Sequence, residues 1–434
     1  MAIGTIWLAR ARRLGVVFCV ALLLTVCAIT QGGLAKTKVV FWTNHHMEHD
    51  PNFERVIAEF EAAHPEIEVE WRNVVDGGSV NYYDVLTVAF LAGNAPDVFY
   101  VRPGTDVDLV ANNWVYDIHS LVERDAVEID VGDFIPAQVS ELQYKGRWWA
   151  LPYDFSAGGL YYNQDLFDGA GLPYPSPAST WDDIVDAAQK LTRRSGDQVT
   201  TWGMNGIEWL FSPWSEGHFL SFGGRLFDET LTKSMANDPN NELALQLPVT
   251  LVHELEVAAP FTVPGYHSLF FDGRAAMTLD GSWNTTTHRA YNQFRFDVSS
   301  MPLGPAGLTV SATGGAWAIS SVTEAPEEAW ALLKALAGES AVRTLIVEPV
   351  RSLPPRVSLM NDWADAVREA GAPASARLLA QQVLDHGKAV PVVGFPFNQV
   401  FYRYHDDLLA GRRSPAEVIE RIHHDFTVEF SRLQ

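Results

Sequence analysis

The segment on which the fold most depends reads WWALPYDFSAGGLYYNQDLFDGAGL and runs from Trp148 to Leu172. Leu151-Pro152 predicts extended backbone, because proline fixes its own φ, lacks a donor and forces the preceding residue into extended geometry. The segment therefore predicts a strand, a bend, a second strand and a short helix over 164–170 that ends at Gly171 in the left-handed conformation. Its aromatic rings either fill a core or face a ligand, and within this segment alone a core is favoured.

The first 35 residues have the pattern of an export signal. Three arginines within Arg10–Arg13 precede an apolar run over 14–29, and Gly33-Leu34-Ala35 is a small-x-small cleavage site. The run of about 16 apolar residues is shorter than the ~20 of a transmembrane helix. A retained anchor stays open as an alternative, since Leu24-Thr25-Val26-Cys27 resembles a lipoprotein cleavage box. Val26 departs from that box, so lipidation at Cys27 is not favoured.

The composition limits the classes of function. Cys19 and Cys27 are the two cysteines of the 434 residues and both lie in the signal, so a mature chain from Lys36 has no thiol for a disulfide, a thiolate metal site or a nucleophile. Without the signal's three arginines the formal charge of −22 becomes −25, which disfavours nucleic acid and anionic lipid as partners. About 400 mature residues suit two lobes of about 200 rather than one core.

Strands and helices alternate after the signal. A strand over 36–42, a helix that carries Phe53 and Phe60, a strand over 67–71, a helix over 83–92 and a strand over 97–101 follow one another. This order predicts parallel strands with right-handed crossovers, and ligands of such sheets bind beyond the carboxyl ends of the strands. Further helices are expected after the caps Thr180 and Ser414.

Several kinds of catalytic or metal site find little support. His46, Glu48, His49 and Asp50 form a metal-like group without the two-histidine helical signature, so a solvated loop is favoured. The segment around Ser156 lacks the glycine that a serine nucleophile elbow needs two residues before the serine. No spacing singles out the pair of carboxylates that a glycosidase requires, and no phosphate-binding glycine loop is present. No cofactor and no metal are expected.

The fourteen tryptophans suggest recognition rather than catalysis. Trp42, Trp209, Trp283 and Trp317 each lie beside turn residues, where a flat ring can meet a ligand. Sugars suit such rings, because their C–H patches stack on the ring while carboxylates and amides bond the hydroxyls. About half of these rings are expected in a core instead.

Four local patterns in a fixed order resemble the extracytoplasmic solute-binding proteins of ABC importers. The resemblance is to their sugar-binding family, which includes the maltose- and glycerol-phosphate-binding proteins. The patterns are Gly93-Asn94-Ala95-Pro96-Asp97-Val98; the segment from Ala150 to Leu172; Phe271 to Met277 with Gly281-Ser282-Trp283; and Gly314-Gly315 ahead of Trp317.

The resemblance implies an α/β fold of two lobes of the type II periplasmic-binding-protein kind, each a mainly parallel sheet flanked by helices, joined by hinge segments. The expected division assigns 36–150 to a first lobe and 151–270 to a second. It then returns 271–313 to the first lobe and 314–434, with the C-terminal helices, to the second.

The resemblance also implies a ligand site between the lobes. Trp42 and Asn44 would follow the first strand and Asp97 the third, Tyr153 and Asp154 would reach in from the second lobe's start, Trp283 would stack on the ligand, and Gly315 with Trp317 would line the floor. The segment around Trp209 is expected to select the sugar. Arg356 completes the set, although Arg351-Ser352-Leu353-Pro354 stands where the family often has glycine before Leu-Pro.

The function implied is capture of a sugar or oligosaccharide by hinge closure, for delivery to a membrane ABC permease by an exported monomer. Two alternatives stay open. One is a secreted glycosidase. The other is a binding protein for a phosphorylated polyol, which needs basic residues in the cleft such as Arg102 and Arg356.

Overall fold

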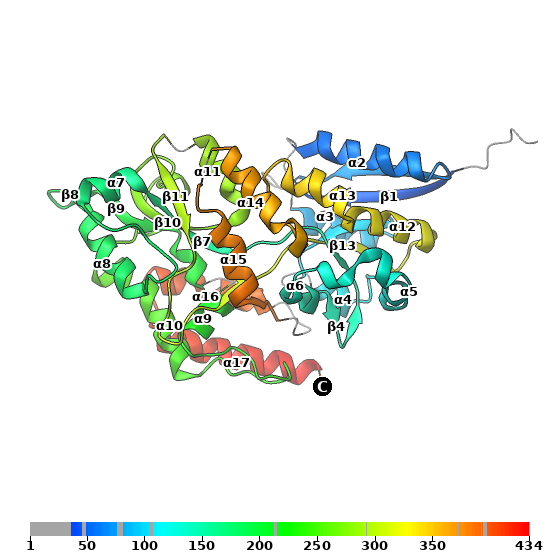
Figure 1. Ribbon diagram of the computed structural model, residues 1–434. Coiled ribbons are helices and arrows are strands. Elements are labelled where there is room, and N and C mark those ends of the chain that lie inside the picture. Colours follow the sequence, from blue (N-terminus) through cyan, green and yellow to red (C-terminus); the bar gives the residue numbers. More distant parts are fainter. Residues whose placement is uncertain are drawn as a thin grey trace, which may run out of the picture.

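The computed structural model describes residues 36–45, 49–75, 81–103, 107–211, 215–291, 293–371, 373–391, 393 and 397–433. The expected export signal, Cys27 included, lies outside these residues. The described chain forms two lobes side by side, each built around a five-stranded sheet (Figure 1). The α/β two-lobed fold predicted from the sequence is confirmed.

Lobe 1 contains the sheet with the order β2-β1-β3-β13-β6. β1 pairs in parallel with β2 and β3, whereas β13 runs antiparallel to both β3 and β6. The predicted helix after β1 buries Phe53, Val56, Ile57 and Phe60. The elements of this lobe are β1 (Thr37–Thr43), α2 (Asp50–Ala63), β2 (Ile67–Asn73), α3 (Tyr82–Leu91), β3 (Val98–Val101), α4 (Val107–Ala111), α5 (His119–Ile129), α6 (Pro136–Glu141), β4 (Gln143–Tyr144), β5 (Arg147–Trp148), β6 (Leu151–Pro152), β13 (Ala316–Ile319), α12 (Pro326–Ala337) and α13 (Glu339–Val342).

Lobe 2 contains the sheet with the order β11-β7-β10-β9-β8. β7 is antiparallel to β10 and β11, and β9 is parallel to β10. As predicted, Thr180 caps its helix in a capping box with Asp183, and Gly171 ends the short helix at φ 64°. The elements are β7 (Gly158–Asn163), α7 (Gln164–Ala170), α8 (Trp181–Leu191), β8 (Arg193–Ser195), β9 (Gln198–Asn205), α9 (Glu216–Ser221), α10 (Pro239–Val249), β10 (Ala275–Gly281), α11 (Thr285–Tyr291) and β11 (Phe296–Ser299).

Two details of the predicted architecture are wrong. Both sheets are mixed rather than mainly parallel, because β13 and β7 are inserted antiparallel to their neighbours. The return segments also join the opposite lobes from those expected: β10 and β11, within 271–313, flank β7 in lobe 2, and β13 with α12 belongs to lobe 1.

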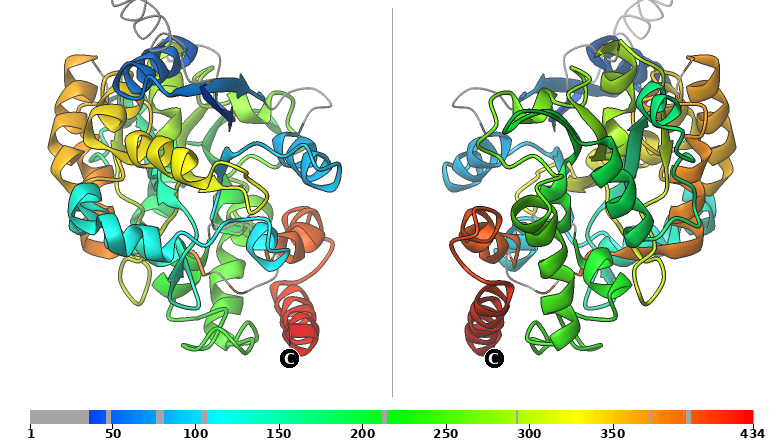
Figure 2. Two further views of the ribbon diagram at one scale, coloured as in Figure 1. Left: turned by 90° about the vertical axis from the view of Figure 1, so that its right-hand side faces the viewer. Right: turned by 90° about the vertical axis from the view of Figure 1, so that its left-hand side faces the viewer.

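The C-terminal helices cover the junction and lobe 2. α14 (Met360–Glu369) and α15 (Arg377–His386) lie across the front of the molecule between the lobes (Figure 1). α16 (Phe397–Leu409) and α17 (Pro415–Leu433) pack on lobe 2, and Figure 2 shows them beside α10 at its lower edge. The predicted capping box of the last helix is present, since the amide of Glu417 donates to Ser414 Oγ and that of Ser414 to Glu417 Oε2.

Three crossing segments join the lobes, namely the first (153–157), the second (309–315) and the third (351–355). Phe155 pairs with Leu353 and Ser156 with Thr313, so the three lie side by side. Ser156 Oγ and Ser352 Oγ are 2.8 Å apart. The hinge segments implied by the resemblance thus form one narrow ribbon between the sheets.

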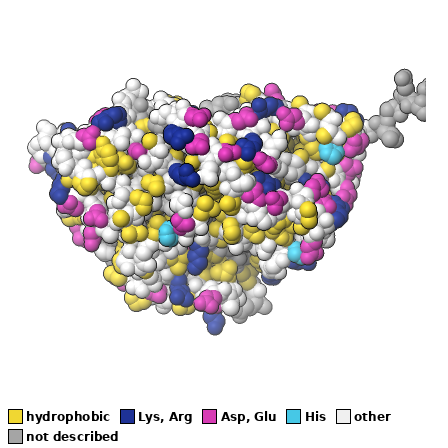
Figure 3. Space-filling view, in the orientation of Figure 1, with side chains coloured by type: hydrophobic (Ala, Val, Ile, Leu, Met, Phe, Trp, Pro, Cys, Tyr) yellow, Lys and Arg dark blue, Asp and Glu magenta, His cyan; other side chains and the backbone are white. Residues whose placement is uncertain are grey.

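Acidic and basic side chains are interspersed over the face seen in Figure 3. Within the described ranges, no helix is both long and apolar enough to cross a bilayer.

Candidate functional site

Two tryptophans form a ring pair on lobe 2. Trp209 lies on the 3-10 turn Ile207–Phe211 that follows β9, and Trp283 lies on the turn Ser282–Asn284 that follows β10. Because β9 and β10 are parallel neighbours, these two turns emerge at the same edge of the sheet. The ring centroids are 5.3 Å apart with the planes at 36°, and both rings are half-buried.

Two glycines make room for these rings. A Cβ on Gly281 would lie 2.5 Å from the ring of Trp283, so a side chain there would displace the ring. A Cβ on Gly158, at the start of β7, would touch Trp209 at 3.5 Å. The Trp209–Trp283 pair therefore lies directly against the end of the first crossing segment.

A small cavity of about 30 Å³ adjoins the pair. Ser156, Ser221, His218 and Thr309 give it polar lining, and Trp181 adds a further ring. Space of this size holds about two water molecules. A sugar ring does not fit unless the tryptophans or the lobes move apart.

Glu208 directly precedes Trp209 and is the acceptor nearest to it along the chain. Its Oε2 accepts from the hydroxyl of Tyr266 at 2.6 Å, and burial raises its pKa. Its Oε1 accepts no hydrogen bond from any residue in the described ranges. Glu208 was not among the predicted site residues, although it lies in the tryptophan-rich segment around Trp209.

Asp280 holds the turn that carries Trp283. Its Oδ1 accepts from the amide of Gly281 at 2.7 Å and from Asn284 Nδ2 at 2.8 Å. Its Oδ2 lies 2.9 Å from Nε2 of His288, a buried ring stacked on Tyr161 with centroids 4.1 Å apart. All of these contacts are made within lobe 2, so Asp280 positions Trp283 rather than bonding a ligand.

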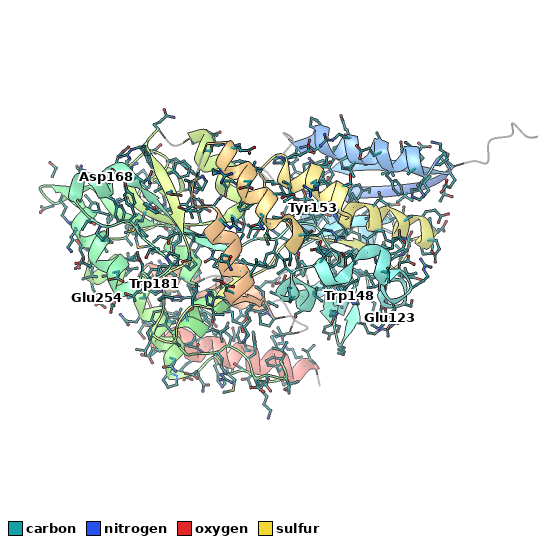
Figure 4. All side chains as sticks on the ribbon, viewed as in Figure 1. Glu123, Trp148, Tyr153, Asp168, Trp181 and Glu254 are labelled. Carbon is teal, nitrogen blue, oxygen red and sulfur yellow. The ribbon has the colours of Figure 1, made fainter. Side chains whose placement is uncertain are left out.

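Asp154 joins the three crossing segments at one carboxylate. Its Oδ1 accepts from the amide of Gly315 at 2.6 Å, and its Oδ2 accepts from Arg351 Nη1 at 2.9 Å. The Arg351 guanidinium also lies over the ring of Tyr153, 5.0 Å from its centroid. The expectation that Asp154 accepts from ligand hydroxyls therefore finds both oxygens already engaged. Figure 4 shows Tyr153 where the chain passes between the lobes.

Gly315 lies in the second crossing segment, where its neighbours leave no room for a side chain. A Cβ there would lie 2.4 Å from the Tyr100 ring and 2.8 Å from Asp154 Oδ1. Its carbonyl accepts from the amide of Tyr153 at 2.9 Å and from Gln138 Nε2 at 3.2 Å. The residue thus lets the second crossing segment approach Asp154.

Trp317 does not line the floor, and the expectation that it does is wrong. Its side chain is fully buried in lobe 1 among Phe41, Phe53, Tyr100 and Tyr153, with centroid distances from 4.4 to 6.1 Å. Trp317 is the second residue of β13, which has a neighbouring strand on each side, and its ring lies in the core of lobe 1.

Trp42 and Asn44 lie at the carboxyl end of β1, as expected. Trp42 is largely buried, and the Arg72 guanidinium lies 4.8 Å from its ring centroid. Asn44 is partly exposed.

Asp97 is misplaced in the prediction, since it precedes β3 instead of following it. Its Oδ2 accepts from the amide of Val40 at 2.8 Å and its Oδ1 from Thr323 Oγ1 at 2.5 Å. The carboxylate therefore ties the start of β3 to β1 and to the loop before α12, at the edge away from the crossing segments.

Arg356 serves helix ends and not the cleft, which corrects the expectation for this residue. Its guanidinium donates to the carbonyls of Ile129 and Ala337, the last residues of α5 and α12, at 2.9 Å each. It also pairs with Asp133 at 3.2 Å. Only 4% of its surface is exposed.

Other expected groups are partly outside the described residues. His46, Glu48 and Trp214 are among these. In the ranges that the structure does describe, no three histidine, aspartate or glutamate side chains gather as a metal site. Trp202 lies on β9 in a separate groove with Phe261 and Pro264.

The model of the bacterial extracellular solute-binding protein family matches residues 45–343. The chain belongs to this family. The sn-glycerol-3-phosphate-binding periplasmic protein UgpB of Escherichia coli K12 is 25% identical over 288 residues, 63% of this chain and 63% of that protein. UgpB of Salmonella typhimurium LT2 is 25% identical over 285 residues, with the same coverage. The match thus spans less than two thirds of these curated relatives.

Solved structures share the fold. Lmo0181 of Listeria monocytogenes, an ABC substrate-binding protein in complex with cycloalternan, superposes with a TM-score of 0.79 at 21% identity, covering 91% of this chain and 99% of that one. UgpB of Mycobacterium tuberculosis with glycerophosphocholine gives 0.76 at 19% identity, covering 92% and 99%. Maltose-bound MalE3 of T. maritima gives 0.72 at 21% identity, covering 90% and 99%.

Proposed function

We propose that this family member is an exported, non-enzymatic monomer that captures a carbohydrate between its lobes and delivers it to an ABC permease. The observation that carries the proposal is the Trp209–Trp283 pair, which lies at the carboxyl ends of β9 and β10 against the first crossing segment. Half-buried rings at such a position suit the C–H faces of a sugar. The serine, threonine and histidine side chains that line the adjoining cavity offer polar groups to sugar hydroxyls, and a typical hydrogen bond contributes roughly 0.5–1.5 kcal/mol net.

The ligands of two proteins of the same fold support a carbohydrate. Cycloalternan and maltose are carbohydrates bound by two proteins of the same fold. The curated relatives are named for sn-glycerol 3-phosphate, so a phosphorylated polyol is the second candidate. Against it, Arg356 faces helix ends, and Asp154 already balances the charge of Arg351.

The test is ligand binding by intrinsic fluorescence and thermal shift. The panel contains D-glucose, D-galactose, maltose, maltotriose, D-glucuronate, sn-glycerol 3-phosphate and glycerophosphocholine. We expect a saturable response to at least one neutral sugar. A response only to the phosphorylated compounds would reject the carbohydrate ligand, and turnover of a chromogenic glycoside would reject the non-enzymatic function.

Single tryptophan variants locate the response. We expect Trp209→Phe and Trp283→Phe each to reduce both the fluorescence change and the affinity for the sugar that binds. Trp202→Phe is the matched control, because that ring lies in a separate groove on lobe 2. An equal loss in all three variants would argue against the Trp209–Trp283 pair as the platform.

A further inference from the structure

Arg351 is held at the meeting point of the three crossing segments. Its Nη1 donates to Asp154 Oδ2 at 2.9 Å, and its guanidinium lies over the Tyr153 ring, 5.0 Å from the centroid. Tyr153 is itself fixed, since it is 1% exposed and its ring lies 4.4 Å from that of Trp317. A guanidinium that is hydrogen-bonded to a carboxylate at one edge and stacked on an aromatic ring with one face has little rotational freedom.

The opposite edge of this guanidinium makes no hydrogen bond to any of the residues that the structure describes. A guanidinium has five N–H groups, and Arg351 donates one hydrogen bond in the described part of the chain. About 13% of its side chain is exposed. The structure therefore presents Nε and Nη2 to whatever lies beside the crossing segments.

The hydroxyl of Tyr153 gives a second, independent sign of a binding position. It is fully buried and has no hydrogen-bond partner among the described residues. Buried hydroxyls are nearly always bonded to protein, water or a ligand. Tyr153 and Arg351 together thus place unsatisfied donors side by side at the junction of the lobes.

From this geometry we propose, resting on the proposed function, that Arg351 selects the ligand by donating from Nε and Nη2 to two adjacent oxygens of an uncharged sugar. Asp154 and Tyr153 are the positioning residues that hold it. In the sequence, Arg351 is noticeable only as part of a departure from the family pattern, because its partner Asp154 lies 197 residues away.

The charge balance of the site favours an uncharged ligand. The carboxylate of Asp154, 7% exposed, offsets the guanidinium at 2.9 Å. A neutral diol gains two hydrogen bonds there without leaving a net charge buried. An anionic ligand would instead compete with Asp154 for the guanidinium, so removing the carboxylate charge should shift selectivity toward anions.

The first experiment measures the affinity for the tightest-binding neutral sugar of the panel and for its monodeoxy analogues. Arg351→Lys keeps the charge but loses the fork of donors, and we expect ~10- to 100-fold weaker binding of the parent sugar. For the deoxy analogue that lacks the recognised hydroxyl, wild type and variant should bind within about twofold of each other. Arg295→Lys is the matched control, an exposed arginine paired with Asp165 and Asp168 on the outer face of lobe 2.

The second experiment uses Asp154→Asn and compares the sugar with D-glucuronate. We expect weaker binding of the sugar and a ratio of sugar to glucuronate affinity lowered at least about fivefold. Equal losses for the parent sugar and every deoxy analogue in Arg351→Lys, or no loss at all, would overturn the inference and leave the proposed function intact. Failure of the wild type to bind any neutral sugar would overturn both.

Discussion

Asp154 is the residue on which the stability of the hinge most depends, because one buried carboxylate meets Gly315 and Arg351 from the other two crossing segments. Removing one partner of a buried ion pair leaves the other charge uncompensated, which costs about 3–5 kcal/mol. We expect Asp154→Ala to lower the free energy of unfolding by about 3 kcal/mol, measured by urea denaturation. Asp165→Ala, which breaks an exposed pair with Arg295, should cost under ~1 kcal/mol. If the stability of Asp154→Ala were unchanged, the carboxylate would not be needed to hold the hinge, and a contact with the ligand would be favoured instead.

Gly315 is a second residue at which a substitution should affect both stability and binding. A Cβ there would overlap the Tyr100 ring and crowd Asp154 Oδ1, and overpacking of this kind costs about 1–3 kcal/mol. We expect Gly315→Ala to lower the midpoint of thermal unfolding and to weaken ligand binding together. Gly169→Ala in α7 meets no atom within 4 Å and should leave binding unchanged while stabilising the helix by about 0.5–1 kcal/mol. The reverse order of stabilities would contradict the steric argument.

At the level of elements, Arg356 joins the ends of α5 and α12 by bonding the carbonyls of Ile129 and Ala337. Its truncation leaves two buried acceptors without a donor, at about 1–3 kcal/mol for each such group. We therefore expect Arg356→Ala to destabilise lobe 1 by roughly 2–4 kcal/mol in urea while the ligand affinity of the folded protein stays within about twofold. Arg368→Ala, an exposed pair with Asp365, serves as control. If Arg356→Ala lost ligand affinity without losing stability, Arg356 would have to contact the ligand, contrary to this prediction.

Helix α9 carries two titrating groups, the buried His218 and the partly buried Glu216, which have opposite effects on stability. Burial lowers the pKa of His218 to about 4 from 6.5, so as the pH falls through this range the unfolded chain takes up a proton that the folded chain refuses, and stability falls. Burial raises the pKa of Glu216 to about 7 from 4.5, so stability falls as the pH rises through that range. Between pH 4.5 and 6.5, the two groups therefore change the free energy of unfolding in opposite directions, and their effects largely cancel.

Single variants of α9 should separate the contributions of Glu216 and His218 to the pH dependence of the free energy of unfolding. We expect Glu216→Gln to gain stability over the wild type progressively from pH 4.5 to 7, and His218→Gln to gain it as the pH falls from 6.5 to 4. Urea denaturation at half-unit steps of pH measures both. Parallel pH profiles for the wild type and both variants would show that neither group is shifted by the fold.

The elements that the sequence predicted well are those with local signals. The capping boxes at Thr180 and Ser414, the left-handed Gly171 and the spacing of Phe53 and Phe60 each depend on residues within a few positions. The pairing of a strand is not local. β10 could join either sheet by its own sequence, and only its register with β7 and β9 assigns it to lobe 2.

In the candidate site too, local sequence patterns were predictive and contacts between distant segments were not. Trp209 and Trp283 were predicted from their positions beside turns, and parallel β9 and β10 bring them together. Trp317 has the same local pattern, yet the place of β13 inside its sheet buries it. Arg351 was missed and Asp154 was assigned to the ligand, because the contact between them joins two crossings that are far apart in sequence.

Closure of the whole molecule supplies the final prediction. The cavity beside the Trp209–Trp283 pair measures about 30 Å³, whereas small-molecule sites usually enclose about 300–1,000 Å³. A carbohydrate can therefore fit beside the rings only if the tryptophans or the lobes move apart, and the narrow ribbon of three crossing segments can act as a hinge for the lobes. We expect small-angle X-ray scattering of the free protein to give a radius of gyration larger than that calculated for residues 36–433 of this structure, falling toward it when the sugar is added. Gly315→Ala, which wedges the ribbon, should reduce the difference between the two states. A radius that does not change on saturation with ligand would mean that the tryptophans move while the lobes stay fixed.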